Sequence, residues 1–253
     1  TGPAMLVGRL SYTLGMQGPC IAFDTACSAS LSACQGAMNA LKSRDSSVGL
    51  VFGVNVMCDS NTSQLFAAAQ MLSPSGKSHT FDARANGYAR SEGVGALVLH
   101  GCEGESSHAL LEGSAVRQDG RSASLTAPNG SAQRTLLVAV LERAAVGASE
   151  VGSIEAHGTG TALGDPTEAG ALVAVHARST AVHAVSAAKG SVGHGEAVSG
   201  QVGLLRLAWV LRKMASAGNA HLRALNPLVN ERLGTVGLTV VFPMEAETSC
   251  CIT

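Results

Sequence analysis

Short apolar runs alternate with longer helical patterns along most of this chain, and that alternation constrains its fold more than any other feature. The longer segments have apolar residues three or four apart, a spacing that gives a helix one apolar face. Strands that alternate with helices are typical of α/β proteins. The runs that we predict to be strands are Pro19–Phe23, Leu50–Val56, Gly95–Leu99, Ser153–Ala156, Ala181–Val185 and Thr239–Phe242.

Four segments are predicted to be helical, because their apolar residues recur at helical spacing over 31–41, 136–146, 172–177 and 197–211. Gly200 and Gly203 lie inside the last of them, and each costs about 1 kcal/mol relative to alanine in a helix. Close packing of the backbone would offset that cost. We therefore predict that this helix is buried.

Composition narrows the classes of function. The chain has 253 residues, 46% of them hydrophobic and 14% charged, and a formal net charge of -1. This balance indicates one large α/β domain or two joined halves, and it argues against an electrostatic nucleic-acid surface. No apolar stretch approaches the roughly 20 residues that span a bilayer. Seven cysteines without C-x-x-C pairs indicate neither a zinc site nor a disulfide framework, so a reducing, cytoplasmic setting is expected. The polar stretch at 101–107 is predicted to separate a domain of residues 1–104 from one of residues 105–253.

The first candidate site lies where the first predicted strand meets the first predicted helix. Residues 23–31 read FDTACSASL, which places Cys27 at or near the start of a helix. The positive end of the helix dipole lowers the pKa of a thiol there, and the small neighbours permit a sharp turn that exposes the sulfur. A buried cysteine that acts as a small apolar side chain is the alternative interpretation.

The second candidate site follows the strand predicted at Ser153–Ala156. Residues 154–168 read IEAHGTGTALGDPTE, so His157 stands at a strand end on a glycine-rich loop. Asp165 is predicted to cap the helix that follows, and Glu168 takes the position of a capping-box acid. Reacting groups gather at such strand ends in α/β proteins. A histidine that only hydrogen-bonds to the local backbone remains an alternative.

The third candidate site follows the strand predicted at Ala181–Val185. Residues 188–196 read AKGSVGHGE, which places Lys189, His194 and Glu196 within one loop before the glycine-containing helix. A cation, an imidazole and a carboxylate can gather around one pocket there. A phosphate-binding loop is less well supported, because the G-x-x-x-x-G-K-[ST] spacing is missing.

The three segments together resemble the active-site motifs of β-ketoacyl synthases, in the same order and with similarly wide separation. They correspond to the cysteine motif, the first histidine motif in its polyketide-synthase form, and the lysine–histidine motif. Segments 81–88, 119–130 and 221–227 are also similar to the family. The resemblance covers essentially the whole chain and points to a ketosynthase domain of a type I polyketide synthase.

Three departures from the family pattern stand out. The family usually has Lys-Ser-Asn before its Gly-His pair, whereas this chain has Lys189-Gly190-Ser191. The chain begins well inside the first half of the family's domain. It also ends before the expected Gly-Phe-Gly segment. The comparison with the family pattern therefore implies a fragment.

The resemblance implies a thiolase-like, layered αβαβα fold built from two related halves, and a homodimer with the strand around Cys20–Phe23 at its interface. It also implies an acyltransferase reaction, the decarboxylative Claisen condensation of an acyl chain with a malonyl-type extender. Both thioesters are carried by acyl carrier protein, in polyketide or fatty acid biosynthesis. Cys27 would hold the acyl chain, and His157 and His194 would stabilise the enolate oxygen.

Supporting roles also follow from the resemblance. Lys189 would organise the site, paired with Glu196. Thr159 and Thr161 would hydrogen-bond the phosphopantetheine arm, which arrives with the carrier. No bound metal or redox cofactor is expected.

Three rival interpretations stay open. A non-elongating, chain-length-type homologue often loses the cysteine or a histidine, whereas all three are present here. A cysteine hydrolase needs one histidine and leaves the second histidine motif unexplained. A thiolase normally adds a second catalytic cysteine near its C-terminus, and Cys250 and Cys251 do not stand in such a motif.

Overall fold

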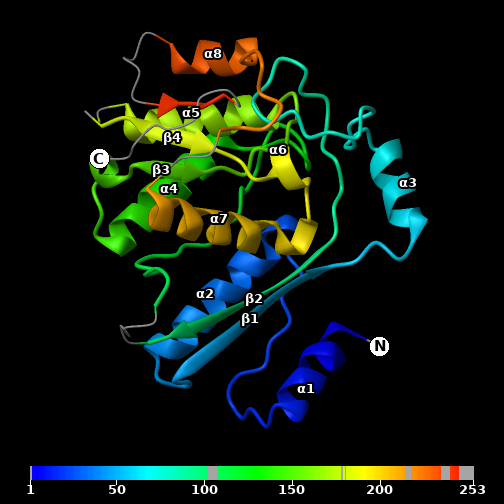
Figure 1. Cartoon of the computed structure of the whole chain (residues 1–253), viewed down its shortest axis with the longest axis vertical. Helices are drawn as coiled ribbons and strands as arrows, with labels where there is room; N and C mark the ends of the chain where they lie inside the picture. The colour runs from blue at the N-terminus through cyan, green and yellow to red at the C-terminus, as the bar shows by residue number, and fades with distance from the viewer. Residues whose placement is uncertain are drawn as a thin grey trace. The chain divides into compact units, whose positions relative to one another are not determined.

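The computed structural model describes residues 2–101, 107–177, 179, 181–214, 218–234 and 240–244. Cys102, Cys250 and Cys251 lie outside these residues, as does most of the stretch at 101–107. Two compact units interleave along the sequence (Figure 1). The predicted division after residue 104 follows chain order and stays a prediction. Unit 1 comprises 1–56, 92–110 and 195–201, and unit 2 comprises 57–91, 111–194 and 202–253.

Unit 1 is built on an antiparallel pair of strands. Strand β1 (Val48–Asn55) pairs with β2 (Gly93–His100) along its whole length. Helix α2 (Ala29–Lys42) packs against β1. The packing is close because β1 has glycines on its inner face: a Cβ added at Gly49 would lie 3.1 Å from the Cβ of Ala37. Both strands and this helix confirm the sequence prediction.

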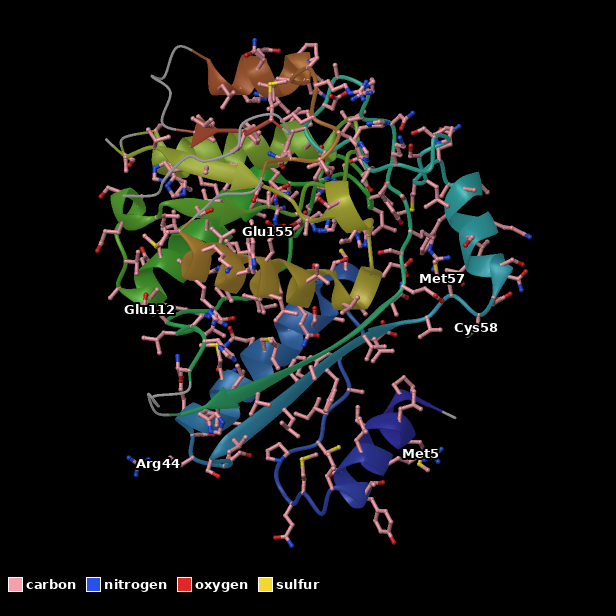
Figure 2. The ribbon with its side chains drawn as sticks, in the orientation of Figure 1. Met5, Arg44, Met57, Cys58, Glu112 and Glu155 are labelled. Atoms are coloured by element: carbon pink, nitrogen blue, oxygen red, sulfur yellow. The ribbon has the colours of Figure 1, made fainter. Side chains whose placement is uncertain are left out.

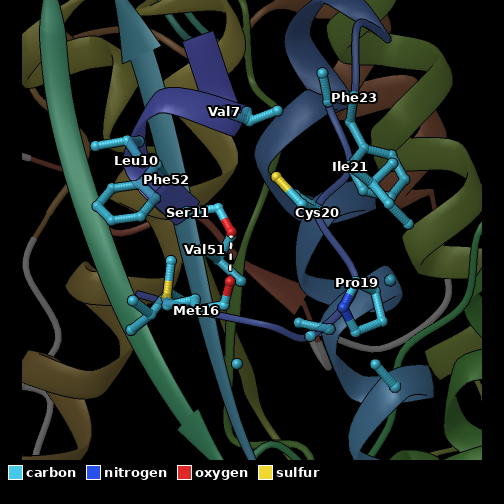
Figure 3. A pocket seen from close by; sticks show the side chains of 18 of the residues that line it. Val7, Leu10, Ser11, Met16, Pro19, Cys20, Ile21, Phe23, Val51 and Phe52 are labelled. Carbon is cyan, nitrogen blue, oxygen red and sulfur yellow. Dashed lines mark hydrogen bonds between the residues drawn. The ribbon is translucent and has the colours of Figure 1, made fainter. Parts of the chain in front are cut away.

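An apolar cavity of about 850 Å³ lies within unit 1, beside the other edge of β1 (Figure 3). Helix α1 (Pro3–Thr13) lines it together with the segment that follows, and Ser11 Oγ of the helix donates to the Met16 carbonyl of that segment at 2.9 Å. The strand predicted at Pro19–Phe23 also lines this cavity, but that prediction is wrong. Pro19–Phe23 forms no ladder with any strand that the structure describes, and a strand depends on such pairing.

Unit 2 contains a parallel sheet in the order β3-β4-β5. Its strands are β3 (Ser153–Glu155), β4 (His183–Ser186) and β5 (Val240–Val241). Their pairing aligns the ends of β3 and β4, because Glu155 lies opposite Ser186. The chain segments that leave these two strands therefore start side by side, as the sequence predicted for neighbouring strand ends.

Three helices accompany this sheet: α4 (Gly130–Ala144), α5 (Gly164–His176) and α8 (Pro227–Leu233). Helix α5 packs against both of the others, and Figure 1 shows α8 on the side of α5 away from β3 and β4. The core of the unit is a cluster of buried apolar side chains, among them Phe81, Ala169, Leu172, Val185, Leu222, Val229 and Phe242.

The remaining elements are short apart from α3 (Ser60–Ala68) and α7 (Ser199–Lys213). The glycines of α7 pack closely, as predicted: a Cβ at Gly200 would lie 2.4 Å from a carbon of Leu31. The rest of the prediction for α7 is wrong, because Leu205, Trp209 and Leu211 are about half exposed. The glycines thus mark one packed face rather than a helix that is buried on all sides. The short elements are η1 (Ala26–Ser28), η2 (Ala148–Glu150), α6 (Lys189–Val192) and η3 (Glu196–Val198).

Among the described residues, no helix is both long and apolar enough to cross a bilayer.

Candidate active site

Cys27 lies at a strained turn in unit 1, directly before α2. Ala26 has a φ of 50°, a left-handed conformation that costs a non-glycine residue about 1 kcal/mol. A side-chain hydrogen bond stabilises the turn: Ser28 Oγ donates to the Thr25 carbonyl at 2.9 Å. Cys27 is half-buried, whereas Cys34, inside α2, is buried and its pKa is raised to about 11 by that burial. The predicted sharp turn and helix start at Cys27 are confirmed.

Two carboxylates of α5 accept hydrogen bonds from the loop that carries His157. Glu168 accepts from the backbone N–H of His157 at 2.6 Å and of Gly158 at 2.8 Å. Asp165 accepts from the N–H of Gly160 at 3.0 Å and of Phe81 at 2.7 Å. Burial raises the pKa of both carboxyl groups, that of Asp165 to about 7.

The capping role predicted for these two acids is therefore wrong. Helix α5 begins at Gly164, whose N–H is accepted by Thr161 Oγ1 at 3.2 Å. Asp165 already lies inside the first turn and points toward the loop. Gly158 and Gly160 adopt left-handed conformations, with a φ of 44° and 77°, and their N–H groups donate to Glu168 and Asp165. A buried N–H needs an acceptor, and these carboxylates supply it.

Two threonine hydroxyls lie together on the same loop. Thr159 is buried, and its Oγ1 lies 3.2 Å from Oγ1 of Thr161. The family resemblance grouped these two residues as contacts of one ligand, and their hydroxyls do lie side by side. Either hydroxyl can act as donor or acceptor toward a polar group in front of the loop.

Lys189 reaches from α6 to the His157 loop. It is buried, and its Nζ donates to the His157 carbonyl at 2.7 Å and lies 3.5 Å from His157 Nδ1. An ammonium group carries only donors, so Nδ1 of His157 acts as the acceptor in that contact. The proton of the neutral ring then sits on Nε2.

His194 follows α6 and is fixed by its own backbone. Its N–H donates to the Ala89 carbonyl at 2.7 Å, and its carbonyl accepts from the N–H of Ser91 at 3.0 Å. Gly193 makes this approach possible, because a Cβ there would lie 3.0 Å from the oxygen of Ala89. The ring of Tyr88 packs against the ring of His194 at a centroid distance of 4.8 Å.

Unit 2 by itself brings the two histidines together, as the motifs predicted. The rings of His157 and His194 have centroids 5.8 Å apart and are nearly perpendicular, at 89°. Cys27 and Glu196 belong to unit 1, where Glu196 begins η3 with a φ of 46°.

Both imidazoles are held in the neutral form. Burial lowers the pKa of His194 to about 4, and the ammonium of Lys189 acts in the same direction. His157 is exposed, and desolvation together with the charges of Lys189 and His194 lowers its pKa. Two neutral imidazoles each offer one N–H donor at neutral pH.

A pH dependence of stability follows from His194. Its pKa falls from 6.5 in the unfolded chain to about 4 in the folded one, so protonation favours the unfolded chain. The free energy of unfolding therefore decreases as the pH falls below about 6.5, and it goes on decreasing until about pH 4. Between these values we expect the parent to lose about 3 kcal/mol more than the His194→Asn variant.

Urea unfolding at a series of pH values measures this difference. Replacement of the exposed His108 by asparagine is the control, and its profile should follow that of the parent. Parallel profiles for the parent and His194→Asn would contradict the lowered pKa of His194.

The chain resembles solved ketosynthase structures along nearly its whole length. It matches the oxazolomycin ketosynthase domain of Streptomyces albus with a TM-score of 0.89 and 30% identity, over 96% of this chain and 43% of that one. It matches the ketosynthase from module 6 of the bacillaene synthase of Bacillus subtilis with a TM-score of 0.90 and 29% identity, over 98% of this chain and 45% of that one. The fold is therefore the thiolase-like α/β fold of these condensing enzymes.

Sequence comparison identifies the family. Residues 1–103 match the family described as Beta-ketoacyl synthase, N-terminal domain, and residues 108–223 match Beta-ketoacyl synthase, C-terminal domain. The chain belongs to the β-ketoacyl synthase family, and it corresponds to ketosynthase sequence of type I polyketide synthases. Ketosynthase domains of these synthases are acyl-transferring condensing enzymes.

Two polyketide synthases illustrate the relation. The chain is 38% identical to a phenolphthiocerol/phthiocerol polyketide synthase of Mycobacterium tuberculosis and 39% identical to the erythronolide synthase EryA2 of Saccharopolyspora erythraea. These matches cover 90% and 92% of this chain. The chain spans only 15% and 7% of the lengths of these two relatives.

Proposed function

We propose that the chain catalyses the decarboxylative Claisen condensation of an acyl chain with a malonyl-type unit in polyketide biosynthesis. The supporting observation is the pair of neutral histidines whose rings converge beside Lys189, because this reaction needs two donors for one oxyanion. Both substrates would be thioesters of an acyl carrier protein. The phosphopantetheine arm of that carrier would be the group that enters the site.

The first stage loads Cys27. Its sulfur attacks the carbonyl carbon of the acyl thioester, the bond from that carbon to the carrier's sulfur breaks, and the thiol proton ends on the departing sulfur. The oxyanion of the tetrahedral intermediate accepts from the backbone N–H of Cys27. The left-handed turn at Ala26 supports this role, since it presents Cys27 at the start of a helix.

The second stage generates the carbon nucleophile. The malonyl thioester loses carbon dioxide, and the electron pair of the broken carbon–carbon bond becomes an enolate. His157 donates to its oxygen from Nε2, because Lys189 occupies Nδ1, and His194 donates from a second direction. The enolate carbon then attacks the acyl thioester on Cys27, and the thiolate of Cys27 leaves.

The remaining groups support these two stages. Thr159 and Thr161 would bind polar groups of the phosphopantetheine arm through their paired hydroxyls. Lys189 fixes the tautomer of His157, and Glu196 is proposed to support Lys189. A homodimer with residues 20–23 at its interface is part of the same proposal.

Acylation of the chain tests the assignment of Cys27. Incubation with an acyl carrier thioester should add one acyl group, detected as a mass increase of the intact protein. Cys27→Ala should lose this adduct, because no other cysteine among the described residues stands at a comparable turn. Cys20→Ala and Cys58→Ala are matched controls, since both thiols are free and exposed, and they should be acylated like the parent. An undiminished adduct in Cys27→Ala would falsify the assignment.

A further inference from the structure

The end of β3 carries a buried carboxylate that takes no direct part in the proposed reaction. Glu155 is the last residue of β3 and lies two positions before His157 (Figure 2). Its side chain is only 6% exposed. A carboxylate buried to this degree is costly unless charged and polar partners compensate it. The partners of Glu155 therefore indicate its role.

Those partners lie on the neighbouring strand end and on α7. Oε1 of Glu155 accepts from the backbone N–H of Ala188 at 2.5 Å, and Oε2 accepts from Ser186 Oγ at 3.2 Å. Oε2 also pairs at 3.2 Å with Nη1 of Arg206, whose Nη2 donates to the Gly218 carbonyl at 3.2 Å. Burial raises the pKa of Glu155, whereas the Ala188 hydrogen bond and the charge of Arg206 lower it. Arg206 thus favours the ionised carboxylate.

This carboxylate joins the two segments that bear the histidines. The last residue pair of the β3–β4 ladder is Glu155 and Ser186. One further backbone hydrogen bond follows it, from the N–H of Ala156 to the carbonyl of Ser186 at 2.7 Å. Ala188 directly precedes Lys189, the first residue of α6, and α6 leads to His194. The bond from Ala188 to Glu155 therefore holds the start of α6 against the strand that leads to His157. Gly203 leaves room for this arrangement, because a Cβ there would lie 3.0 Å from Cγ of Glu155.

We propose that the Glu155–Arg206 ion pair is a positioning device that sets the separation of the His157 and His194 rings. It holds the Lys189 turn in place, and Lys189 in turn donates to the His157 carbonyl at 2.7 Å. The inference deepens the proposed function and rests on it for one point only, namely that this separation suits an enolate oxygen.

Glu155 affects the histidines through geometry and not through a direct effect of its charge. The groups that lower the pKa of His194 are its burial and Lys189, and His157 is lowered by the same two causes and by His194. The Glu155 charge therefore acts on the imidazoles indirectly, through the ion pair with Arg206 that keeps the Lys189 turn in place, and a variant that breaks this pair releases the turn. A displaced Lys189 turn moves the ammonium away and admits water, and both changes raise the two pKa values.

The test follows the protonation of both histidines by NMR in the full chain at pH 5. Because the pKa of His194 is about 4, about one tenth of this imidazole is protonated there in the parent. Glu155→Gln and Arg206→Met should each raise that fraction to about one half, a shift of about one pH unit. Arg206→Lys keeps the charge opposite Glu155 and should restore a fraction close to that of the parent. If Glu155→Gln does not fold, the comparison of Arg206→Met with Arg206→Lys decides.

Asp82→Asn is the matched control. Asp82 is a fully buried carboxylate paired with Arg84 at 2.6 Å, and its other bonds go to the N–H groups of Arg84, Arg223 and Ala224, outside both histidine loops. This variant should lose stability in urea without a change in histidine protonation. The same result for Glu155→Gln and Arg206→Met would overturn the proposal and leave the pair a purely structural one. So would equal fractions in Arg206→Met and Arg206→Lys.

Carbon dioxide release from a malonyl thioester is measured on the same proteins. The parent is expected to release carbon dioxide, and Glu155→Gln and Arg206→Met are expected to release it at least tenfold more slowly. That result would support both the positioning role of the ion pair and the proposed function. A parent that releases none contradicts the proposed function, and the NMR comparison still decides the positioning role by itself.

Discussion

His194→Ala and His157→Ala are each expected to release carbon dioxide from a malonyl carrier thioester about 10² to 10³ times more slowly than the parent. Each substitution removes one neutral N–H donor to the developing enolate oxygen, and the loss of one such donor typically costs about 3–4 kcal/mol. Self-acylation of Cys27 should persist in both variants, because the enolate forms only in the second stage.

Two assays on the same samples separate the stages. Mass spectrometry reports the acyl adduct on Cys27, and release of labelled carbon dioxide reports the decarboxylation. His108→Ala, which removes an exposed histidine, serves as the control for both. A histidine whose replacement leaves decarboxylation at the parental rate is structural, and the two-donor mechanism would then be wrong.

The candidate site residues were predictable because their signals are local. A cysteine between small residues at a helix start predicts an exposed thiol, and the structure places Cys27 behind a left-handed alanine. Strand ends followed by glycine-rich loops predict converging side chains. The rings of His157 and His194 do converge, with Lys189 in contact with His157. The pairing of Lys189 with Glu196 stays a prediction.

The groups behind these residues were not predictable, because their partners are distant in sequence. Asp165 and Glu168 match a capping pattern, and nothing local reveals that loop N–H groups compete for their oxygens. Glu155 ends an apolar strand, which was its one available signal, yet the role inferred for it depends on Ala188 and on Arg206, 51 positions away. Capping rules count neighbours within one turn, so tertiary acceptors and donors lie beyond them.

The errors of the fold prediction have the same origin. The apolar run Pro19–Phe23 predicts a strand, but whether it forms one depends on a partner ladder that the run does not specify. The glycines of α7 predicted close packing correctly at Gly200, where Leu31 lies against the backbone. They carried no information on the opposite face of that helix, where Trp209 is half exposed.

Gly158→Ala should destabilise the protein by about 2–4 kcal/mol and displace the loop that carries His157. Gly158 has a φ of 44°, and an added Cβ would lie 2.5 Å from Cβ of Ala187 and 2.6 Å from Cγ2 of Thr80. Both neighbours are fixed, since Thr80 Oγ1 donates to the Gly158 carbonyl at 2.9 Å and Ala187 lies in the core. The variant therefore combines backbone strain of about 1 kcal/mol with overpacking of about 1–3 kcal/mol.

Gly120→Ala separates these two contributions in the same unit. Gly120 has a φ of 65°, also left-handed, but an added Cβ there meets nothing within 4 Å. Its replacement should cost only the strain, about 1 kcal/mol. Urea unfolding of both variants, followed by circular dichroism, measures the difference. Equal losses would mean that Gly158 is needed only for its backbone conformation, and that the His157 loop has room to move. A clearly larger loss at Gly158 would mean that close contact with Thr80 and Ala187 fixes the position of the loop that carries His157.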